Sequence, residues 1–160
     1  MYFGIERVAD AVEGAGIRAN LGYGMISTGK DEEQAREEFE NGVAFADEYD
    51  GAAEGRVNTM VRPHAPYTCD GWLLEEAAER ADELGCVFHT HLSETADEVD
   101  ESVAEHGMRP AWYLDELGCF DGGHDSYVAH AVHLDSDEIT LLSEKDVSVA
   151  HCPSANMKLA

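Results

Sequence analysis

The chain has 160 residues, of which 44% are apolar, and its 34 acidic residues against 10 basic ones give a formal net charge of −24. This length and apolar content are sufficient for one domain with a buried core, and they exclude disorder driven by charge. A surface this acidic repels phosphate backbones and anionic lipids, so the composition argues against nucleic-acid and membrane binding.

The sequence alternates between extended and helical patterns along its length. The predicted strands are residues 17–25, 56–63, 86–92, 127–134 and 147–151. The predicted helices are residues 5–16, 31–49, 70–85, 95–107, 110–118 and 135–146, and residues 152–160 are expected to form a loop. Strict alternation predicts an α/β fold with a mostly parallel sheet, either a doubly wound sheet or a (β/α) barrel.

Two of the predicted helices carry clear end signals. Asp70 is expected to be the N-cap of helix 70–85, and Gly85 its C′ residue. Thr95 and Glu98 have the spacing of a capping box, which places the beginning of the next helix at Thr95.

Composition also suggests the compartment. No apolar run approaches the roughly 20 residues that span a bilayer, and the first residues lack a basic region followed by an apolar core. The cysteines Cys69, Cys86, Cys119 and Cys152 are scattered, as is typical of a reducing environment. Because strong self-repulsion destabilises a compact fold unless salt screens it, we expect a cytoplasmic protein from a high-salt cell.

Histidines recur at the ends of the predicted strands. In both candidate architectures, functional groups collect at the carboxyl ends of parallel strands. Four strands in a row carry a histidine there: His64, His91, His130 and His151. A single strand histidine is usually a hydrogen-bonded core residue, but four on one rim predict a functional cluster.

The segment CVFHTHLSE places three reactive side chains close together. His89 and His91 share one face of the predicted strand, and His91 is nearer the rim, which makes it the better metal ligand. His89 is either a second ligand or a packed residue of the layer below, and packing is favoured. Glu94 lies just past the strand, where it is either a protonatable carboxylate or a charge at the helix N-terminus.

These residue types suit metal-assisted hydrolysis. A divalent metal held by imidazole and carboxylate groups lowers the pKa of bound water to about 7. Glu94 would carry a proton from that water, and His130 would orient the water and stabilise developing charge. The ligand set is incomplete, because the sequence has no HxH pair near its beginning and no aspartate beyond its last predicted strand.

Four motifs resemble one known family. The segments PHAPYTC (63–69), HTHLSET (89–95), AHAVHL (129–134) and AHCPSANMKLA (150–160) are similar in order and spacing to the amidohydrolase superfamily. The nearest branch contains the 5-methylthioadenosine/S-adenosylhomocysteine deaminases and the triazine chlorohydrolases. The resemblance implies that residues 1–160 form one partial (β/α)₈ barrel domain of the TIM type, roughly strands three to seven. It also implies that strands one, two and eight are missing, together with the flanking β-sandwich, the HxH pair and the ligating aspartate.

The resemblance further implies a role for each matching residue. His91 is similar to the third ligand of one divalent metal, with zinc favoured over iron or manganese. Glu94 resembles the proton shuttle that also hydrogen-bonds a ring nitrogen of the purine. His130 resembles the histidine that polarises the attacking water, and His64 the histidine that contacts the substrate. The implied reaction is attack of metal hydroxide on C6 of an adenosine-type nucleoside, with release of ammonia.

Other positions are less well matched. His151 and Asn156 belong to the fourth motif and are expected to shape its loop. Relatives hold the substrate's sugar or tail with arginines near strand three, where this chain has Tyr23, and Arg36 is a second candidate. This leaves the exact substrate open.

Three alternatives accompany this interpretation. One is another reaction of the superfamily: deamination of guanine or cytosine, or dechlorination of a triazine. Another is a flavodoxin-like binding module without catalysis. A third is a fragment that is inactive alone. Its exposed parallel edges are an aggregation risk unless partner chains cover them, as they would in a homo-oligomer. We expect the isolated chain to be inactive and its parent protein to be the deaminase.

Overall fold

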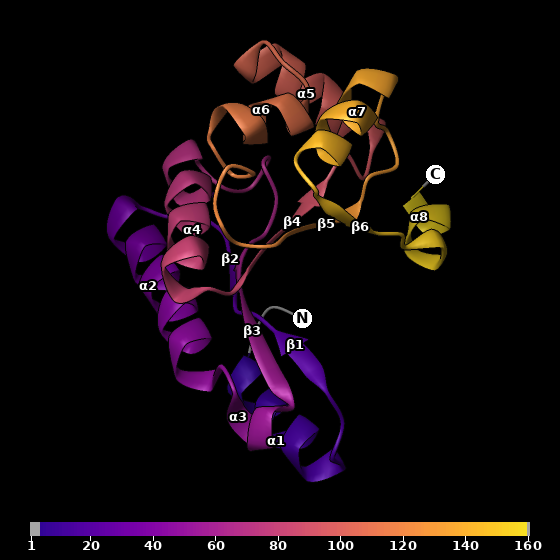
Figure 1. The fold of residues 1–160 in the computed structure, drawn as a ribbon. Coiled ribbons are helices and arrows are strands. Elements are labelled where there is room, and N and C mark those ends of the chain that lie inside the picture. The colour runs from indigo at the N-terminus through magenta and orange to yellow at the C-terminus, as the bar shows by residue number, and fades with distance from the viewer. Residues whose placement is uncertain (1–3, 160) are drawn as a thin grey trace.

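The computed structural model describes residues 4–159, which form a parallel sheet covered by helices (Figure 1). The strands are β1 (Ala19–Leu21), β2 (Gly24–Met25), β3 (Val57–Pro63), β4 (Val87–Leu92), β5 (Ser126–His130) and β6 (Ser148–Ala150). The helices are α1 (Ile5–Ala15), α2 (Glu32–Tyr49), α3 (Ala52–Gly55), α4 (Gly71–Leu84), α5 (Ala96–His106), α6 (Pro110–Glu116), α7 (Ser136–Glu144) and α8 (Pro153–Leu159).

The order of the strands decides between the two predicted architectures. The sheet runs β1-β3-β4-β5-β6, with β2 also paired to β3, and every pairing is parallel. A doubly wound sheet reverses its strand order at a switch point, whereas a barrel adds strands in chain order. The described strands follow chain order without reversal. They form part of a (β/α)₈ barrel, and the flavodoxin-like alternative is wrong.

The main core lies between the sheet and the helices. Val61, Phe88 and Val128 point from three neighbouring strands toward Leu73 and Leu74 of α4, and all five are fully buried. Each such side chain stabilises the fold by about 1.5–3 kcal/mol relative to an exposed position. A second apolar cluster holds α1 against β1 and α2. The helical layer therefore fixes the strands whose ends carry the histidines.

The opposite face of the sheet, here called the inner face, is lined by the alternate residues. Arg62 of β3, His89 and His91 of β4, and Tyr127 of β5 lie on it, since their strand neighbours pack into the helical layer. In a complete barrel this face is filled by side chains from all the strands. The predicted shared face of His89 and His91 is confirmed, with ring centroids 5.7 Å apart.

Three of the secondary-structure predictions are wrong. The strand predicted over 17–25 is divided into β1 and β2 at Gly22, whose backbone lies so close to Met60 that a Cβ atom would be 2.5 Å from the Met60 Cγ atom. The strand predicted over 127–134 ends at His130, because His130 and Ala131 adopt positive φ angles of 75° and 50°.

The third difference is at the end of the chain, where the predicted loop is the helix α8. Pro153 suits the first helical position because it needs no amide donor. The carbonyl group of Cys152 accepts hydrogen bonds from the amides of Ala155 and Asn156.

The capping signals are partly confirmed. Asp70 and Gly85 occupy the predicted cap positions of α4, but the Asp70 side chain makes no capping hydrogen bond. Thr95 is the N-cap of α5, and its hydroxyl accepts a hydrogen bond from the Glu98 amide at 3.2 Å.

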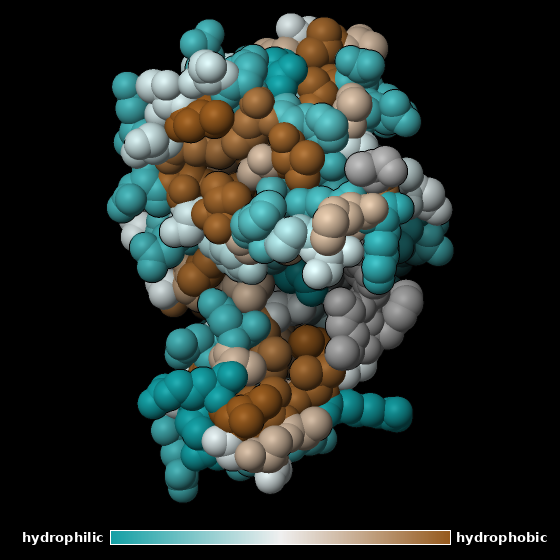
Figure 2. Space-filling view, turned by 90° about the vertical axis from the view of Figure 1, so that its right-hand side faces the viewer, coloured by the Kyte–Doolittle hydropathy of each residue, from teal (hydrophilic) through white to brown (hydrophobic). Residues whose placement is uncertain are grey.

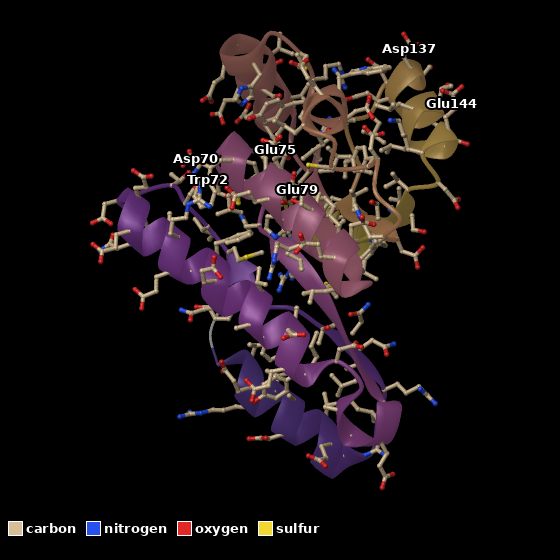
Figure 3. The ribbon with its side chains drawn as sticks, turned by 60° about the vertical axis from the view of Figure 1, so that its left-hand side comes forward. Asp70, Trp72, Glu75, Glu79, Asp137 and Glu144 are labelled. Atoms are coloured by element: carbon tan, nitrogen blue, oxygen red, sulfur yellow. The ribbon has the colours of Figure 1, made fainter. Side chains whose placement is uncertain are left out.

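The surface of the described residues combines acidic helices with apolar patches. Figure 3 labels Asp70, Glu75 and Glu79 on or next to α4, and Asp137 and Glu144 on α7, all of them exposed. Figure 2 shows two apolar patches, one at the height of α7 and β6 and one at the height of α1 and β1. None of the helices within residues 4–159 is long and apolar enough to cross a membrane.

Candidate active site

Three of the four predicted rim histidines lie side by side. The ring centroid of His91 is 4.8 Å from that of His64 and 5.4 Å from that of His130. These residues stand at the ends of β3, β4 and β5, as predicted. His151 follows β6 with an exposed side chain. The sheet therefore gathers His64, His91 and His130 into one cluster.

His91 is held so that one ring nitrogen can bind a ligand. Its Nδ1 atom lies 2.5 Å from the carbonyl oxygen of His64, which also accepts the His91 amide at 3.0 Å. A carbonyl can only accept, so Nδ1 donates and Nε2 keeps its lone pair. Burial lowers the pKa of His91, with a smaller contribution from the positive charge of Arg62. A neutral imidazole fixed through Nδ1 is the usual form of a metal-binding histidine.

The fit to a metal is partial. Within residues 4–159, no group of three or more histidine, cysteine, aspartate or glutamate side chains is arranged to hold a metal ion. A catalytic zinc ion needs three protein ligands and an open position. His91 therefore suits the role of one ligand, and residues 4–159 do not supply a complete ligand set.

His64 is also fixed through Nδ1. The Thr68 hydroxyl donates to the Ala65 carbonyl at 3.2 Å and lies 2.7 Å from the His64 Nδ1 atom, so it accepts the Nδ1 proton. Burial, the neighbouring His91 and the charge of Arg62 lower the pKa of His64 to about 4. At neutral pH the ring is an uncharged acceptor through Nε2.

His89 lies in the layer below. It is 6% exposed, its Nδ1 atom is 2.9 Å from the carbonyl oxygen of Tyr127, and its ring stacks on the Tyr127 ring at 4.3 Å. Burial lowers the pKa of His89 to about 4, partly offset by that hydrogen bond. These contacts favour the packing role over the ligand role.

Glu94 and His130 form the second half of the site. The Glu94 Oε1 atom lies 3.3 Å from the His130 Nε2 atom, and the two side chains are 17% and 9% exposed. On the opposite side of the ring, Nδ1 lies 2.7 Å from the Oδ1 atom of Asn156. Glu94 and Asn156 also border a cavity of about 360 Å³ next to α8. The carboxylate is thus next to both an imidazole and open space.

Hydrogen bonds between two turns join the halves of the site. Ser93 and His130 have positive φ angles of 48° and 75°, which are uncommon for residues with a side chain. The Ser93 carbonyl accepts the amides of Val132 and His133, each at 3.0 Å. The turn after β4 therefore fixes the turn after β5. Strained backbone conformations of this kind persist only where surrounding contacts hold them. They are common at functional sites.

The two candidate substrate-tail residues lie elsewhere. Tyr23 packs against the helical layer and borders a cavity with Glu6 and Asn41. The Arg36 guanidinium lies 3.7 Å from the centre of the Trp72 ring and 2.5 Å from Glu76 on α4 (Trp72 is labelled in Figure 3). Neither side chain joins the histidine cluster.

The sequence did not predict the contribution of two residues near the histidine cluster. Arg62 lies on the inner face one layer below His64, where its charge affects the pKa of both His64 and His91. Its position two residues before His64 on a strand was the available signal. Asn156 was expected only to shape a loop, and its contact with His130 joins residues 26 positions apart, which no local pattern indicates.

Comparison with known proteins agrees with this geometry. The family model described as "Amidohydrolase family" matches residues 1–160. The chain is 53% identical over 160 residues to a 5-methylthioadenosine/S-adenosylhomocysteine deaminase of Natronomonas pharaonis, covering all of this chain and 37% of the relative. It is 43% identical over 160 residues to a 5'-deoxyadenosine deaminase of Methanobrevibacter smithii, covering all of this chain and 36% of the relative.

A solved structure matches at the level of the fold. The crystal structure of an adenosine deaminase from Xanthomonas campestris with bound zinc superposes with a TM-score of 0.86 at 33% identity, over 99% of this chain and 36% of that one. The chain thus spans little more than a third of the length of the relatives it matches. Since the family match extends over every residue, the chain belongs to the amidohydrolase family.

Proposed function

We propose that the protein containing this chain is a metal-dependent hydrolytic deaminase of adenosine-type nucleosides, with 5-methylthioadenosine and S-adenosylhomocysteine as the favoured substrates. The names of the relatives support this substrate class. The observation that carries the chemistry is the contact of Glu94 with His130 at 3.3 Å, next to the His91 ring on the same rim. The overall reaction replaces the C6 amino group of the purine by oxygen from water and releases ammonia.

His91 is the residue of this chain that would hold the metal. Its Nδ1 atom donates to the His64 carbonyl, which leaves Nε2 as the nitrogen that can bind a metal. Burial lowers the pKa of the ring and so favours its neutral form. A bound divalent metal would supply an acidified water molecule to the site. Zinc is favoured because a structural relative contains it, and iron or manganese would suit the same nitrogen.

Glu94 is proposed as the proton carrier. Its carboxylate is mostly buried and borders a cavity, so it can reach both water and a ring bound there. It would move one proton from the attacking water to the purine nitrogen adjacent to C6. It would then move the second proton, from the hydroxyl group added at C6, to the amine, so that ammonia leaves and the C6 carbonyl forms. General acid–base catalysis of this kind contributes about 10²–10⁴-fold to a rate.

His130 and His64 are proposed to orient the reactants. The His130 ring is fixed between Asn156 and Glu94, so its Nε2 atom can accept a hydrogen bond from the attacking water and, once it has taken up a proton, stabilise the charge that develops on oxygen. His64, held by Thr68, offers Nε2 as an acceptor to a hydroxyl or amino group of the substrate.

The remaining proposals concern the whole protein. Unpaired edges at β1 and β6 in the described sheet, and an apolar groove lined by Val132, Ile139 and Val149 beside β6, support further barrel strands and helices that pack there. We propose that residues 1–160 form one section of a larger barrel domain in a cytoplasmic protein from a high-salt cell. A homo-oligomer remains a prediction.

The test is a substrate screen with the zinc-loaded full-length protein. Ammonia release would be measured with 5-methylthioadenosine, S-adenosylhomocysteine, 5'-deoxyadenosine, guanine and cytosine, and chloride release would be measured with a chlorotriazine. We expect turnover of the nucleosides and a fall in kcat of at least about 100-fold for Glu94→Gln. Glu101→Gln, on the exposed face of α5, is the matched control. Turnover of only a free base or the triazine would favour the alternatives, and release of no ammonia from any nucleoside would refute the proposal.

A further inference from the structure

Glu98 is a buried carboxylate directly behind the candidate proton carrier. It lies in the first turn of α5 and is 4% exposed. Its Oε1 atom accepts the Ser93 amide and its Oε2 atom accepts the Glu94 amide, both at 2.7 Å. Burial raises the pKa of Glu98, and the amides that donate to the carboxylate oppose this shift.

The two contacts account for a carboxylate at this position. A capping box needs only one acceptor atom, which glutamine supplies as well as glutamate. Two amides that point at two separate side-chain oxygens require a carboxylate, since glutamine would place its NH₂ group against one of the donors. A buried donor or acceptor without a partner costs about 1–3 kcal/mol. The pair of amides therefore selects glutamate over glutamine.

The turn that Glu98 holds sets the position of the catalytic pair. Ser93 is in the left-handed region with φ 48°, and Glu94 follows it. The Ser93 carbonyl receives the two amides of the turn after His130. By fixing the backbone of residues 93 and 94, Glu98 determines the direction of the Glu94 side chain. It also determines the position of the Ser93 carbonyl, which binds the turn next to His130.

We infer that Glu98 is a positioning residue of the reaction, which aims the Glu94 carboxylate at His130 and at the substrate through the two backbone amides. This inference rests on the proposed deaminase function. A plain helix cap would stabilise α5 without affecting proton transfer, whereas a positioning residue acts through Glu94. Displacement of a reacting group by about 1 Å costs as much as about 10²-fold in rate.

A double-mutant cycle in the full-length protein separates these roles. Glu98→Gln is expected to lower kcat by about 10–100-fold. In the Glu94→Gln background the same change should lower the residual rate by no more than about twofold, because its effect passes through Glu94. Asp82→Asn is the matched control: Asp82, in the last turn of α4, accepts a hydrogen bond from the Gly123 amide at 2.6 Å in the turn that precedes β5, at the opposite end of that strand from His130. Its loss should leave kcat within about twofold of wild type.

A second variant keeps the inference testable if Glu98→Gln alone does not fold. In Glu98→Gln combined with Ser93→Gly, glycine removes the cost of the positive φ angle at residue 93, so the chain gains stability. The turn still lacks the carboxylate that accepts both backbone amides. This variant should also have a reduced kcat. Wild-type kcat in either folded variant, or equal losses in both backgrounds of the cycle, would overturn the inference.

A structural readout separates failure of this inference from failure of the proposed function. If the wild-type protein releases no ammonia, the proposed function fails, and crystal structures of the full-length wild type and Glu98→Gln decide the positioning role. The inference predicts that the Glu94 carboxylate leaves its 3.3 Å contact with His130 in the variant. An unchanged contact would overturn it.

Discussion

The Oδ1 atom of Asn156 lies 2.7 Å from the Nδ1 atom of His130. This contact connects α8 to the end of β5 and leaves the His130 Nε2 atom directed at Glu94. With the amide oxygen as acceptor, Nδ1 carries the proton, and Nε2 is the nitrogen that can exchange a proton with Glu94 or with water. Asn156 thereby fixes both the orientation and the tautomer of the ring.

Asn156→Ala in the full-length protein removes this acceptor and frees the ring. We expect kcat for the preferred nucleoside to fall about tenfold or more with a smaller change in KM, because a misoriented ring affects the transition state more than binding. Ser154→Ala, at an exposed position of the same helix, is the control. An unchanged kcat for Asn156→Ala would mean that the contact has no role in orientation.

The buried histidines predict an acid-labile fold. Burial lowers the pKa of both His64 and His89 to about 4, whereas an unfolded histidine titrates near 6.5. Between these values the unfolded chain binds more protons than the folded chain, so stability is lost as pH falls from about 6.5 to about 4. One fully buried histidine contributes a slope of up to about 1.4 kcal/mol per pH unit.

His89→Gln isolates this contribution, since glutamine keeps a donor for the Tyr127 carbonyl but does not titrate. Urea unfolding of the metal-free protein from pH 4 to 7 should give a shallower dependence of the free energy of unfolding for the variant, by about 1 kcal/mol per pH unit. Parallel curves for variant and wild type would contradict the assigned pKa shift of His89.

The isolated 160-residue chain is expected to bind zinc weakly or not at all. His91 suits a single ligand, and one imidazole does not hold a zinc ion against water. Isothermal titration of the chain with zinc checks this, with His91→Ala as the comparison. Nanomolar affinity that disappears in His91→Ala would mean that residues 1–160 contain a complete site.

The acidic surface predicts a stability that depends on salt. The net charge of −24 places many like charges on the outer helices, among them Glu75, Glu79, Asp137 and Glu144 (Figure 3). Raising the salt concentration from 0.1 to 1 M shortens the screening length from about 10 to about 3 Å. We expect Tm in thermal unfolding to rise by about 4 °C or more, which corresponds to about 1 kcal/mol. A Tm independent of salt would argue against the high-salt cell.

The sequence was sufficient for the parts of the fold that depend on local pattern. Alternating apolar residues located the strands, and the histidines at their ends located His64, His91 and His130 on one rim. The choice of a barrel over a doubly wound sheet needed the resemblance to the family or the observed strand order, because both folds have the same alternation.

The remaining features depend on contacts between distant residues. The end of β5 at His130 is set by positive φ angles and by hydrogen bonds to the turn after β4, which an apolar run through residue 134 conceals. The spacing of Thr95 and Glu98 indicated a helix cap, but the two contacts of the Glu98 carboxylate with the Ser93 and Glu94 amides became visible only with the turn in place. Helix α8 is short and mostly exposed, so it lacks the apolar face from which longer helices are predicted.

A crystal structure of the full-length protein with zinc and an inosine-type product is the most direct test, since the whole interpretation requires one small molecule to be surrounded by groups from three neighbouring strand ends. The expected result is zinc on Nε2 of His91, the purine within hydrogen-bond distance of Glu94, and His64 and His130 in contact with the ligands. Product bound in another part of the protein, or zinc held without His91, would contradict it.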